Sequence, residues 1–167
     1  GLEQWSITLN SMRDDGSLPI ETRRGARALF YHGRTISALI QIAERARVQG
    51  IDLYGRTPAN AGSIHHAVNF FLDAVLDPSI VLPYARSNKA PGPSKDYTRQ
   101  DLGGGGTLGW IAPYMTRFPN HPNTHRLRAI SGKETYLTPH LASVVQNYGG
   151  SNEWIGVDTR CFYAKPQ

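Results

Sequence analysis

Apolar residues recur at helical spacing from Ile20 to Val48, and this stretch limits the possible fold more than any other feature of the chain. At about 100° per residue its apolar side chains fall on one arc, which predicts an amphipathic helix with one buried face. They are Leu29, Ile36, Leu39, Ile40 and Ala43. Pro19 suits the start of this helix and Gly50 its end. Gly33 is unfavourable inside a helix by about 1 kcal/mol relative to alanine, so it predicts close packing or a bend.

Weaker helical patterns occupy much of the remaining chain, whereas strand signals are few, so the predicted fold class is mainly α. Further helices are predicted over Leu2 to Met12, Ala61 to Leu76, Thr107 to Arg117 and Leu137 to Tyr148. Residues 82 to 106 are rich in Gly, Pro and polar residues and predict a long irregular loop. The stretch FPNHPNTHR, residues 118 to 126, predicts a polar turn, and a short extended piece is expected near Trp154 to Tyr163.

Length and composition favour a single globular domain over residues 1 to 167, because 167 residues with 40% hydrophobic content are enough to bury a core. The chain lacks any apolar run near the roughly 20 residues that span a membrane. Its first residues, GLEQWSITLN, lack the pattern of a signal peptide. A mature secreted chain or a fragment would lack this pattern as well. Cys161 is the only cysteine, so no internal disulfide can form.

The formal net charge of +5 points to acidic partners, which could be nucleic acid, anionic lipid or an acidic polysaccharide. Basic residues are concentrated in RRGARALFYHGR, Arg23 to Arg34. If this segment belongs to one helix, Arg24, Arg27, Tyr31 and Arg34 share a face. A solvated basic face would explain the arginines, but a tyrosine among cations is also typical of a site for an anionic ligand.

Such a face could carry out proton transfer beside a carboxylate. In a continuous helix Arg27 lies one turn before Tyr31 and would influence it most, whereas Arg24 lies nearly two turns away and would bind a ligand carboxylate. An arginine that neutralises a carboxylate, with a tyrosine that takes or gives a proton, suits removal of the proton α to that carboxylate. In a uronic-acid polymer, this step followed by loss of the 4-linked oxygen is β-elimination.

Other motifs give weaker indications. His65 and His66 are adjacent and point about 100° apart on a helix, so surface or boundary positions are expected for them. His121, His125 and His140 lack ligand spacing, so no metal site and no cofactor are predicted. The four glycines from residue 103 to 106 lack the lysine and preceding strand of a phosphate-binding loop. Nucleic-acid binding is disfavoured because neither an aromatic-rich sheet nor a helix-turn-helix signal accompanies the arginines.

Several segments in order resemble the alginate lyases of the α/α-toroid type. They are GSLPIETRRGARALFYH at residues 16 to 32, IAERARVQGIDLYG at residues 42 to 55, LDAVLDP at residues 72 to 78 and QDLGGGGTLGWIAPYMTRFPN at residues 100 to 120. In the last segment Trp110 and Pro113-Tyr114 match a Trp-x-x-Pro-Tyr element. The chain departs from the family pattern at Gly33-Arg34, where Asn-Tyr is frequent, and at Met115, where the family has cysteine.

The resemblance implies a polysaccharide lyase that cleaves alginate or a related uronan by β-elimination without a required metal. It implies part of an α/α toroid, built of helical hairpins with long loops, that lacks the N-terminal half. Arg24 and Tyr31 match the catalytic arginine and tyrosine. Substrate-binding roles are expected for Arg27, His32, Arg34, Trp110 and Tyr114.

The family's Asn-His pair lies upstream of the matched region, so an N-terminal half of the same enzyme is an expected partner, together with the acidic polysaccharide. Mannuronate-rich alginate, polyglucuronate and other uronans stay open as substrates. The expected location is the periplasm or the exterior, and no nucleic-acid or membrane partner is predicted. The alternative is a non-catalytic module, or a lyase fragment without the Asn-His pair, that only binds acidic polysaccharide.

Overall fold

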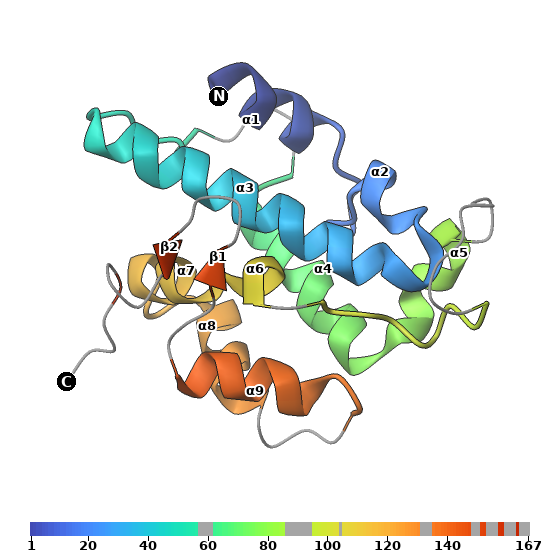
Figure 1. Cartoon of the computed structure of the whole chain (residues 1–167). Coiled ribbons are helices and arrows are strands. Elements are labelled where there is room, and N and C mark those ends of the chain that lie inside the picture. The colour runs from blue at the N-terminus through green and yellow to red at the C-terminus, as the bar shows by residue number, and fades with distance from the viewer. Residues whose placement is uncertain are drawn as a thin grey trace.

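Two helices that pack against each other, α3 (Ala28–Val48) and α4 (Ile64–Leu76), form the centre of the fold. The structure, a computed structural model, describes residues 1–56, 62–85, 95–103, 105–130, 135–147, 151–152, 157–158 and 163. Helix α3 is 21 residues long, and α4 packs against it (Figure 1). The predicted apolar arc of α3 is confirmed, because Leu29, Ile36 and Ile40 are fully buried.

Shorter elements surround this pair. They are α1 Leu2–Asn10, α2 Pro19–Thr22, the 3₁₀ helices η1 Gly25–Arg27 and η2 Pro78–Val81, α5 Leu82–Ala85, α6 Gly105–Leu108, α7 Ile111–Arg117, α8 Pro122–Ala129, α9 Thr138–Gln146, β1 Ser151–Asn152 and β2 Val157–Asp158. Helices α1 and α2 pack on α3, while α8 contacts α4 and α9 packs against α6, α7 and α8. Figure 1 shows α1 and α9 on opposite sides of the α3–α4 pair. The described structure is therefore mainly helical, as predicted.

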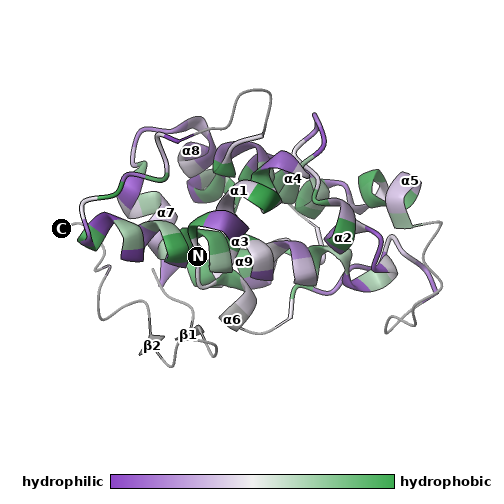
Figure 2. Ribbon diagram, turned by 90° about the horizontal axis from the view of Figure 1, so that it is seen from above, coloured by the Kyte–Doolittle hydropathy of each residue, from purple (hydrophilic) through white to green (hydrophobic). Residues whose placement is uncertain are grey.

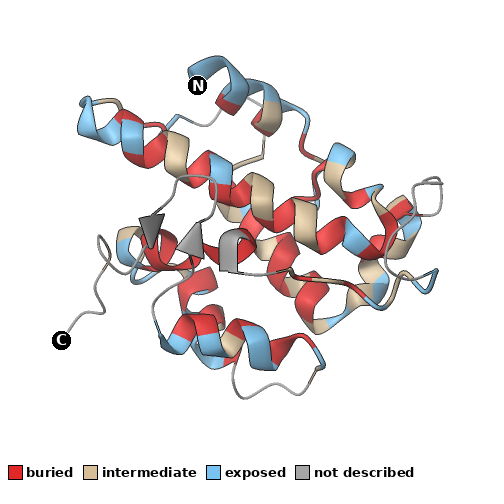
Figure 3. Ribbon diagram, in the orientation of Figure 1, coloured by how far each residue is buried: buried red, intermediate tan, exposed pale blue. Residues whose placement is uncertain are grey.

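Burial follows the two-faced character of the helices. Apolar side chains of α3, α4 and α7 form one continuous core, with Phe71 of α4 meeting Trp110 edge to face. Figure 2 shows hydrophobic and hydrophilic residues interspersed along the helices, and Figure 3 shows buried, intermediate and exposed positions following one another along α3. Gly33 lies where α3 packs closely against α6, because a Cβ on Gly33 would lie 2.8 Å from Thr107 Cγ2. The predicted close packing at Gly33 is thus confirmed, and the helix continues through it.

The long helix predicted from Ile20 is interrupted, so that prediction is wrong at its N-terminal end. Helix α2 ends at Thr22, and a 3₁₀ turn, η1, precedes α3. Gly25 has φ of +58°, a left-handed conformation that residues with a Cβ rarely adopt. A Cβ on Gly25 would also lie 2.8 Å from the ring of Tyr97. The break therefore depends on a glycine and on an aromatic ring more than 70 positions away in the sequence.

Three further predictions need correction. The segment from residue 107 to 117 divides into the end of α6 and α7, and FPNHPNTHR forms a turn only at residues 119–120, before α8 begins at Pro122. The His121 side chain caps α8 by accepting from the backbone N–H of Asn123, with Pro122 at the first helical position. The predicted loop over 82 to 106 begins in α5 and ends in α6, and residues 86–94 lie outside the described residues.

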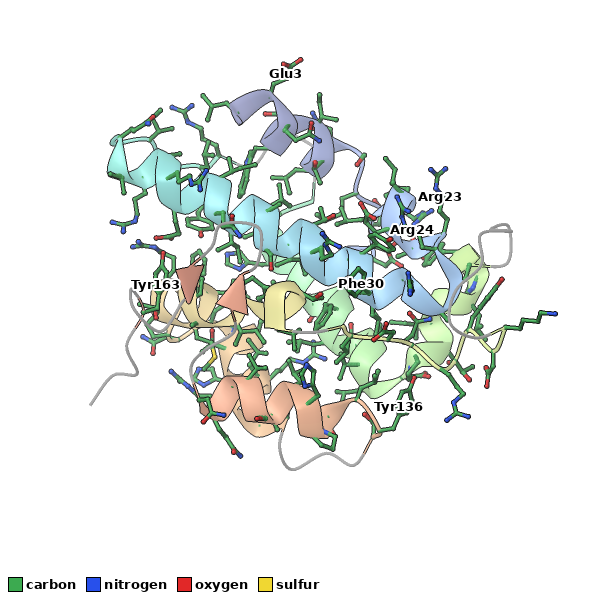
Figure 4. The ribbon with its side chains drawn as sticks, viewed as in Figure 1. Glu3, Arg23, Arg24, Phe30, Tyr136 and Tyr163 are labelled. Atoms are coloured by element: carbon green, nitrogen blue, oxygen red, sulfur yellow. The ribbon has the colours of Figure 1, made fainter. Side chains whose placement is uncertain are left out.

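The last segment is tied back to α3 through a buried carboxylate. Glu44 accepts hydrogen bonds from Tyr163 at 3.1 Å and from Arg117 of α7 at 3.3 Å. Figure 4 labels Tyr163. Within the predicted extended piece, residues 154 to 163, only β2 is described as a strand, and it pairs antiparallel with β1 just before that range; residues 153–156 and 159–162 lie outside the described residues. Among the described helices, none is both long enough and apolar enough to cross a membrane.

Candidate active site

The interruption before α3 brings Arg24 onto Tyr31. Because Arg24 precedes η1, its side chain is not held to the spacing of α3, and its guanidinium carbon lies 4.2 Å from the centre of the Tyr31 ring. This is a cation–π contact that places positive charge beside the phenol. The prediction that Arg24 lies nearly two turns from Tyr31, with Arg27 as the nearer influence, is wrong, because it assumed a continuous helix. Arg27 is exposed at the end of η1.

Arg24 is accessible on one side and held on the other. Its side chain is 39% exposed, and its Nε lies 3.4 Å from Glu21 Oε2 of α2. Glu21 Oε1 in turn accepts a hydrogen bond of 3.1 Å from the Thr35 hydroxyl of α3. Two elements therefore fix the carboxylate against which Arg24 rests.

Residues 95–103 hold the turn that carries Arg24. The side-chain amide of buried Gln100 donates to the carbonyl of Gly25 at 2.9 Å and accepts from the backbone N–H of Leu29 at 3.0 Å. The N–H of Asp101 donates to the carbonyl of Ala26 at 3.0 Å. These bonds satisfy backbone groups that the break leaves unpaired. Sequence reasoning missed Gln100, because a single glutamine in a glycine-rich segment carries no pattern.

A second cation and aromatic pair continues the surface along α3. The Arg34 guanidinium lies 5.1 Å from the centre of the Phe30 ring, and Phe30 meets Tyr31 edge to face at 5.0 Å. Two aromatic rings, Tyr31 and Phe30, thus lie in contact between Arg24 and Arg34, and all four side chains are partly exposed. Figure 4 labels Arg23, Arg24 and Phe30 beside the N-terminal part of α3. We call this row the arginine–aromatic surface.

His32 lies on the opposite side of α3 from this surface. It is fully buried, its Nε2 is 3.0 Å from the carbonyl oxygen of Ala67, and its ring packs on Phe70. Burial lowers the pKa of His32 from 6.5 to about 4, so the ring is neutral near pH 7. The expected substrate-binding role of His32 is therefore not supported by its burial in the described structure.

Trp110 and Tyr114 are also core residues, so their predicted substrate-binding roles are not supported by the structure. The two side chains are almost completely buried and pack edge to face with each other. Helix α7 turns this face toward α4, where Phe71 contacts Trp110 and His65 contacts Tyr114. Their helical spacing marks a buried stripe of α7.

Tyr114 is the centre of a polar cluster that the sequence did not reveal. Its hydroxyl lies 2.8 Å from His65 Nδ1 and 3.2 Å from His121 Nδ1, and the two imidazoles stack with centres 4.1 Å apart. Burial, and then the neighbouring His121, lower the pKa of His65 to about 4. We call Tyr114, His65 and His121 the tyrosine–histidine cluster.

The tyrosine–histidine cluster does not have the properties of a metal site. His121 Nδ1 accepts from the N–H of Asn123, so the proton of the neutral ring is on Nε2, which then cannot bind a metal. Within the described part of the chain, no group of three or more His, Cys, Asp or Glu side chains could hold a metal ion. The cluster joins α4 to α7 and the start of α8.

A shallow apolar groove of about 270 Å³ lies between α1, α2 and α3. Ile7, Ile20 and Leu39 contribute to its walls, and Glu21 and Thr35 line it as well. Glu21 thus lines this groove and also contacts Arg24.

Comparison with known proteins gives consistent matches. The family model for alginate lyase matches residues 2–81. An alginate lyase of Pseudomonas syringae pv. syringae (strain B728a) is 32% identical over 122 residues, which are 73% of this chain and 29% of the relative. A polysaccharide lyase of Stenotrophomonas maltophilia (strain K279a) is 38% identical over 71 residues, 42% of this chain and 19% of the relative.

Solved structures give a similar match. Alginate lyase A1-III from Sphingomonas species A1 superposes with a TM-score of 0.59 and 29% identity, over 74% of this chain and 33% of that protein. A Tyr-to-Phe variant of alginate lyase A1-III, in complex with a tetrasaccharide, gives a TM-score of 0.70 and 25% identity over 99% of this chain and 40% of that protein. The chain thus spans about a third of the length of these relatives. It carries a portion of their helical α/α-toroid fold, and over the matched regions it is similar to alginate lyases.

Proposed function

We propose that this chain supplies the arginine and tyrosine of a lyase that cleaves a uronate polysaccharide, such as alginate, by β-elimination. The observation that carries the proposal is the contact of Arg24 with Tyr31, 4.2 Å from guanidinium carbon to ring centre. It puts a carboxylate-binding group beside a proton-transferring group on an accessible surface. The similarity to alginate lyases supports the same chemistry.

Each residue has a distinct part in this reaction. Arg24 binds the uronate carboxylate and stabilises the negative charge that develops there when the proton on the adjacent C5 is removed. The electron pair of that C–H bond forms the double bond between C4 and C5, and the bond from C4 to the linking oxygen breaks. Tyr31 gives a proton to the departing oxygen and is also a candidate for the base.

The substrate class follows from the charge of the surface. Arg27 and Arg34 add positive charge on either side of Tyr31 along the chain, which suits a polymer with a carboxylate on successive sugars. Arg34 stands where the family frequently has tyrosine, so this chain carries one more cation in that region. Mannuronate-rich alginate and polyglucuronate are the two substrates we propose to compare.

A second candidate is binding without turnover. The chain spans about a third of its relatives, and His32, the imidazole next to Tyr31 in sequence, is buried away from the surface. In this case an upstream half bearing the Asn-His pair completes the site, and this chain alone only holds the polyanion. Because such a polymer is encountered outside the cytoplasm, we propose the periplasm or the exterior as the location.

One assay separates the two candidates. The chain is incubated with polymannuronate and, separately, with polyglucuronate, and the ultraviolet absorbance of the unsaturated uronate product is followed while binding is measured by calorimetry. Product formation supports the lyase proposal for the chain alone. Binding without product favours the second candidate, and absence of both contradicts the two together.

A further inference from the structure

Glu21 stands behind Arg24 at a point where a negative charge should weaken binding of a polyanion. Its side chain is only 17% exposed and lies within the α2–α3 interface. Glu21 Oε2 is 3.4 Å from Arg24 Nε, and Oε1 accepts from the Thr35 hydroxyl at 3.1 Å. The carboxylate thus bridges the residue that binds substrate and the helix that carries Tyr31.

The Glu21 carboxylate contacts the edge of the Arg24 guanidinium that carries Nε. Arg24 Nε is buried and makes no hydrogen bond of good geometry with the described residues, so the ion pair with Glu21 is its polar contact on that side. The face of the guanidinium rests on the Tyr31 ring. With one edge and one face occupied, the terminal nitrogens are left to bind a carboxylate in a fixed orientation.

We propose that Glu21 is a positioning residue, which holds Arg24 against the Tyr31 ring so that its terminal nitrogens meet the substrate carboxylate. This inference rests on the proposed function and assigns to Glu21 a part in it that is not direct contact with substrate. Thr35 belongs to the same arrangement, because its hydroxyl fixes the far oxygen of the carboxylate. The order of contacts is Thr35, Glu21, Arg24 and Tyr31.

The proposal makes a prediction opposite in sign to simple electrostatics. Glu21→Gln removes a negative charge close to a polyanion site, which by charge alone tightens binding. If Glu21 positions Arg24, the same change weakens binding instead, because a freed arginine must be ordered again in the complex. Ordering one long side chain corresponds to about a 2- to 10-fold loss in affinity.

The test measures calorimetric affinity for a mannuronate tetrasaccharide and, if the chain is active, kcat and KM. Glu3→Gln is the matched control, because it removes the same charge from an exposed position on α1 (Figure 4). We expect weaker binding and lower kcat/KM for Glu21→Gln, with no loss for Glu3→Gln. Tighter binding by Glu21→Gln, equal to or greater than that of Glu3→Gln, would overturn the proposal.

A second pair of variants tests the bridge without changing charge. Thr35→Val removes the hydroxyl that holds Glu21 and should weaken binding in the same direction, by about 2-fold, because the carboxylate keeps its ion pair. Thr35→Ser keeps a hydroxyl and should restore the affinity. Thr8→Val changes another threonine that lines the same groove and should leave binding unchanged. Equal losses for Thr8→Val and Thr35→Val would contradict a specific role for Thr35.

A measurement on the free protein separates this inference from the proposed function. Protons of the Arg24 side chain that lie over the Tyr31 ring are shifted upfield in the NMR spectrum by the ring current. We expect this shift to diminish in Glu21→Gln and to persist in Glu3→Gln, with circular dichroism confirming that both fold. If the wild type binds no uronate, the proposed function fails while this measurement still decides the role of Glu21. A persistent shift in Glu21→Gln would refute that role.

Discussion

Tyr31 and Tyr114 both lie next to basic side chains, but their surroundings differ. Tyr31 lies on the arginine–aromatic surface, partly exposed, under a guanidinium that also reaches solvent. Tyr114 lies in the tyrosine–histidine cluster, fully buried, with its hydroxyl shared between two imidazoles. Burial raises the pKa of Tyr114 well above its ordinary value, which keeps it protonated.

The difference shows that residue type and helical spacing do not define a reactive site. Tyr114 has more hydrogen-bond partners than Tyr31, but those partners are internal and satisfied. Tyr31 has a cation whose remaining donors are available to a ligand. Accessibility of the charged neighbour therefore separates a site for chemistry from a polar element of the core.

The largest effect is expected from removing the two hydroxyls in turn. Tyr31→Phe should lower cleavage by about 10²- to 10⁴-fold, because the proton-transfer group is lost, while polymer binding stays nearly intact. Tyr114→Phe should leave kcat within about 3-fold of the wild type, because its hydroxyl faces the core. Both are measured by the absorbance of the unsaturated product. Equal activity of Tyr31→Phe and wild type would remove the proposed role of Tyr31.

Acid should weaken the core while sparing the arginine–aromatic surface. His32 and His65 have pKa values near 4 in the fold and an ordinary value of 6.5, so unfolding takes up protons between these limits. Their stabilising contribution is complete above about pH 6.5 and falls as the pH drops to about 4, by roughly 3 kcal/mol for buried His32. An arginine guanidinium is positively charged over this whole pH range. Urea unfolding at several pH values measures the loss, and stability that stays constant from neutral pH down to pH 4 would contradict it.

Loss of Gln100 should affect the arginine–aromatic surface before the core. Gln100→Leu leaves the Leu29 N–H and the Gly25 carbonyl without their side-chain partner, and an unpaired buried group is unfavourable by about 1 to 3 kcal/mol. We expect lower stability together with weaker uronate binding, because the turn carrying Arg24 is released. Denaturant unfolding and calorimetry are the two measurements. Unchanged affinity would show that Arg24 does not depend on residues 95–103.

The smallest effect is expected for the stability of Tyr114→Phe. The change removes the hydroxyl shared by His65 and His121 but keeps the ring, so the free energy of unfolding should fall by about 1 kcal/mol. Tyr31→Phe is the control, because its hydroxyl is not part of the core, and its stability should be nearly that of the wild type. Denaturant unfolding of both variants provides the comparison. A larger loss for Tyr31→Phe would reverse the assignment of the two regions.

The sequence predicted what depends on local periodicity. The apolar arc of α3, the helix α4 and the resemblance through Arg24 and Tyr31 follow from residues close together in the chain. The behaviour of Gly25 and Gly33 could not be predicted in the same way. Gly25 lies in the break between α2 and α3 whereas Gly33 lies inside α3, and the neighbours that crowd them, Tyr97 and Thr107, are distant in sequence. The burial of Trp110 and Tyr114 could not be predicted for the same reason. Helical spacing shows which residues share a helix face, but it does not show which other residues cover that face.

The docking of Gln100 also determines when the site forms. Its bonds to Gly25 and Leu29 join residues 75 and 71 positions apart, whereas the turns of α3 and α4 need only local contacts. Long-range contacts require closure of a large loop and form late in folding. We therefore expect Arg24 to reach Tyr31 only after the α3–α4 pair has folded. The same bonds should be among the first to open in the native state, so backbone amides near η1 should exchange with solvent faster than those in the middle of α3.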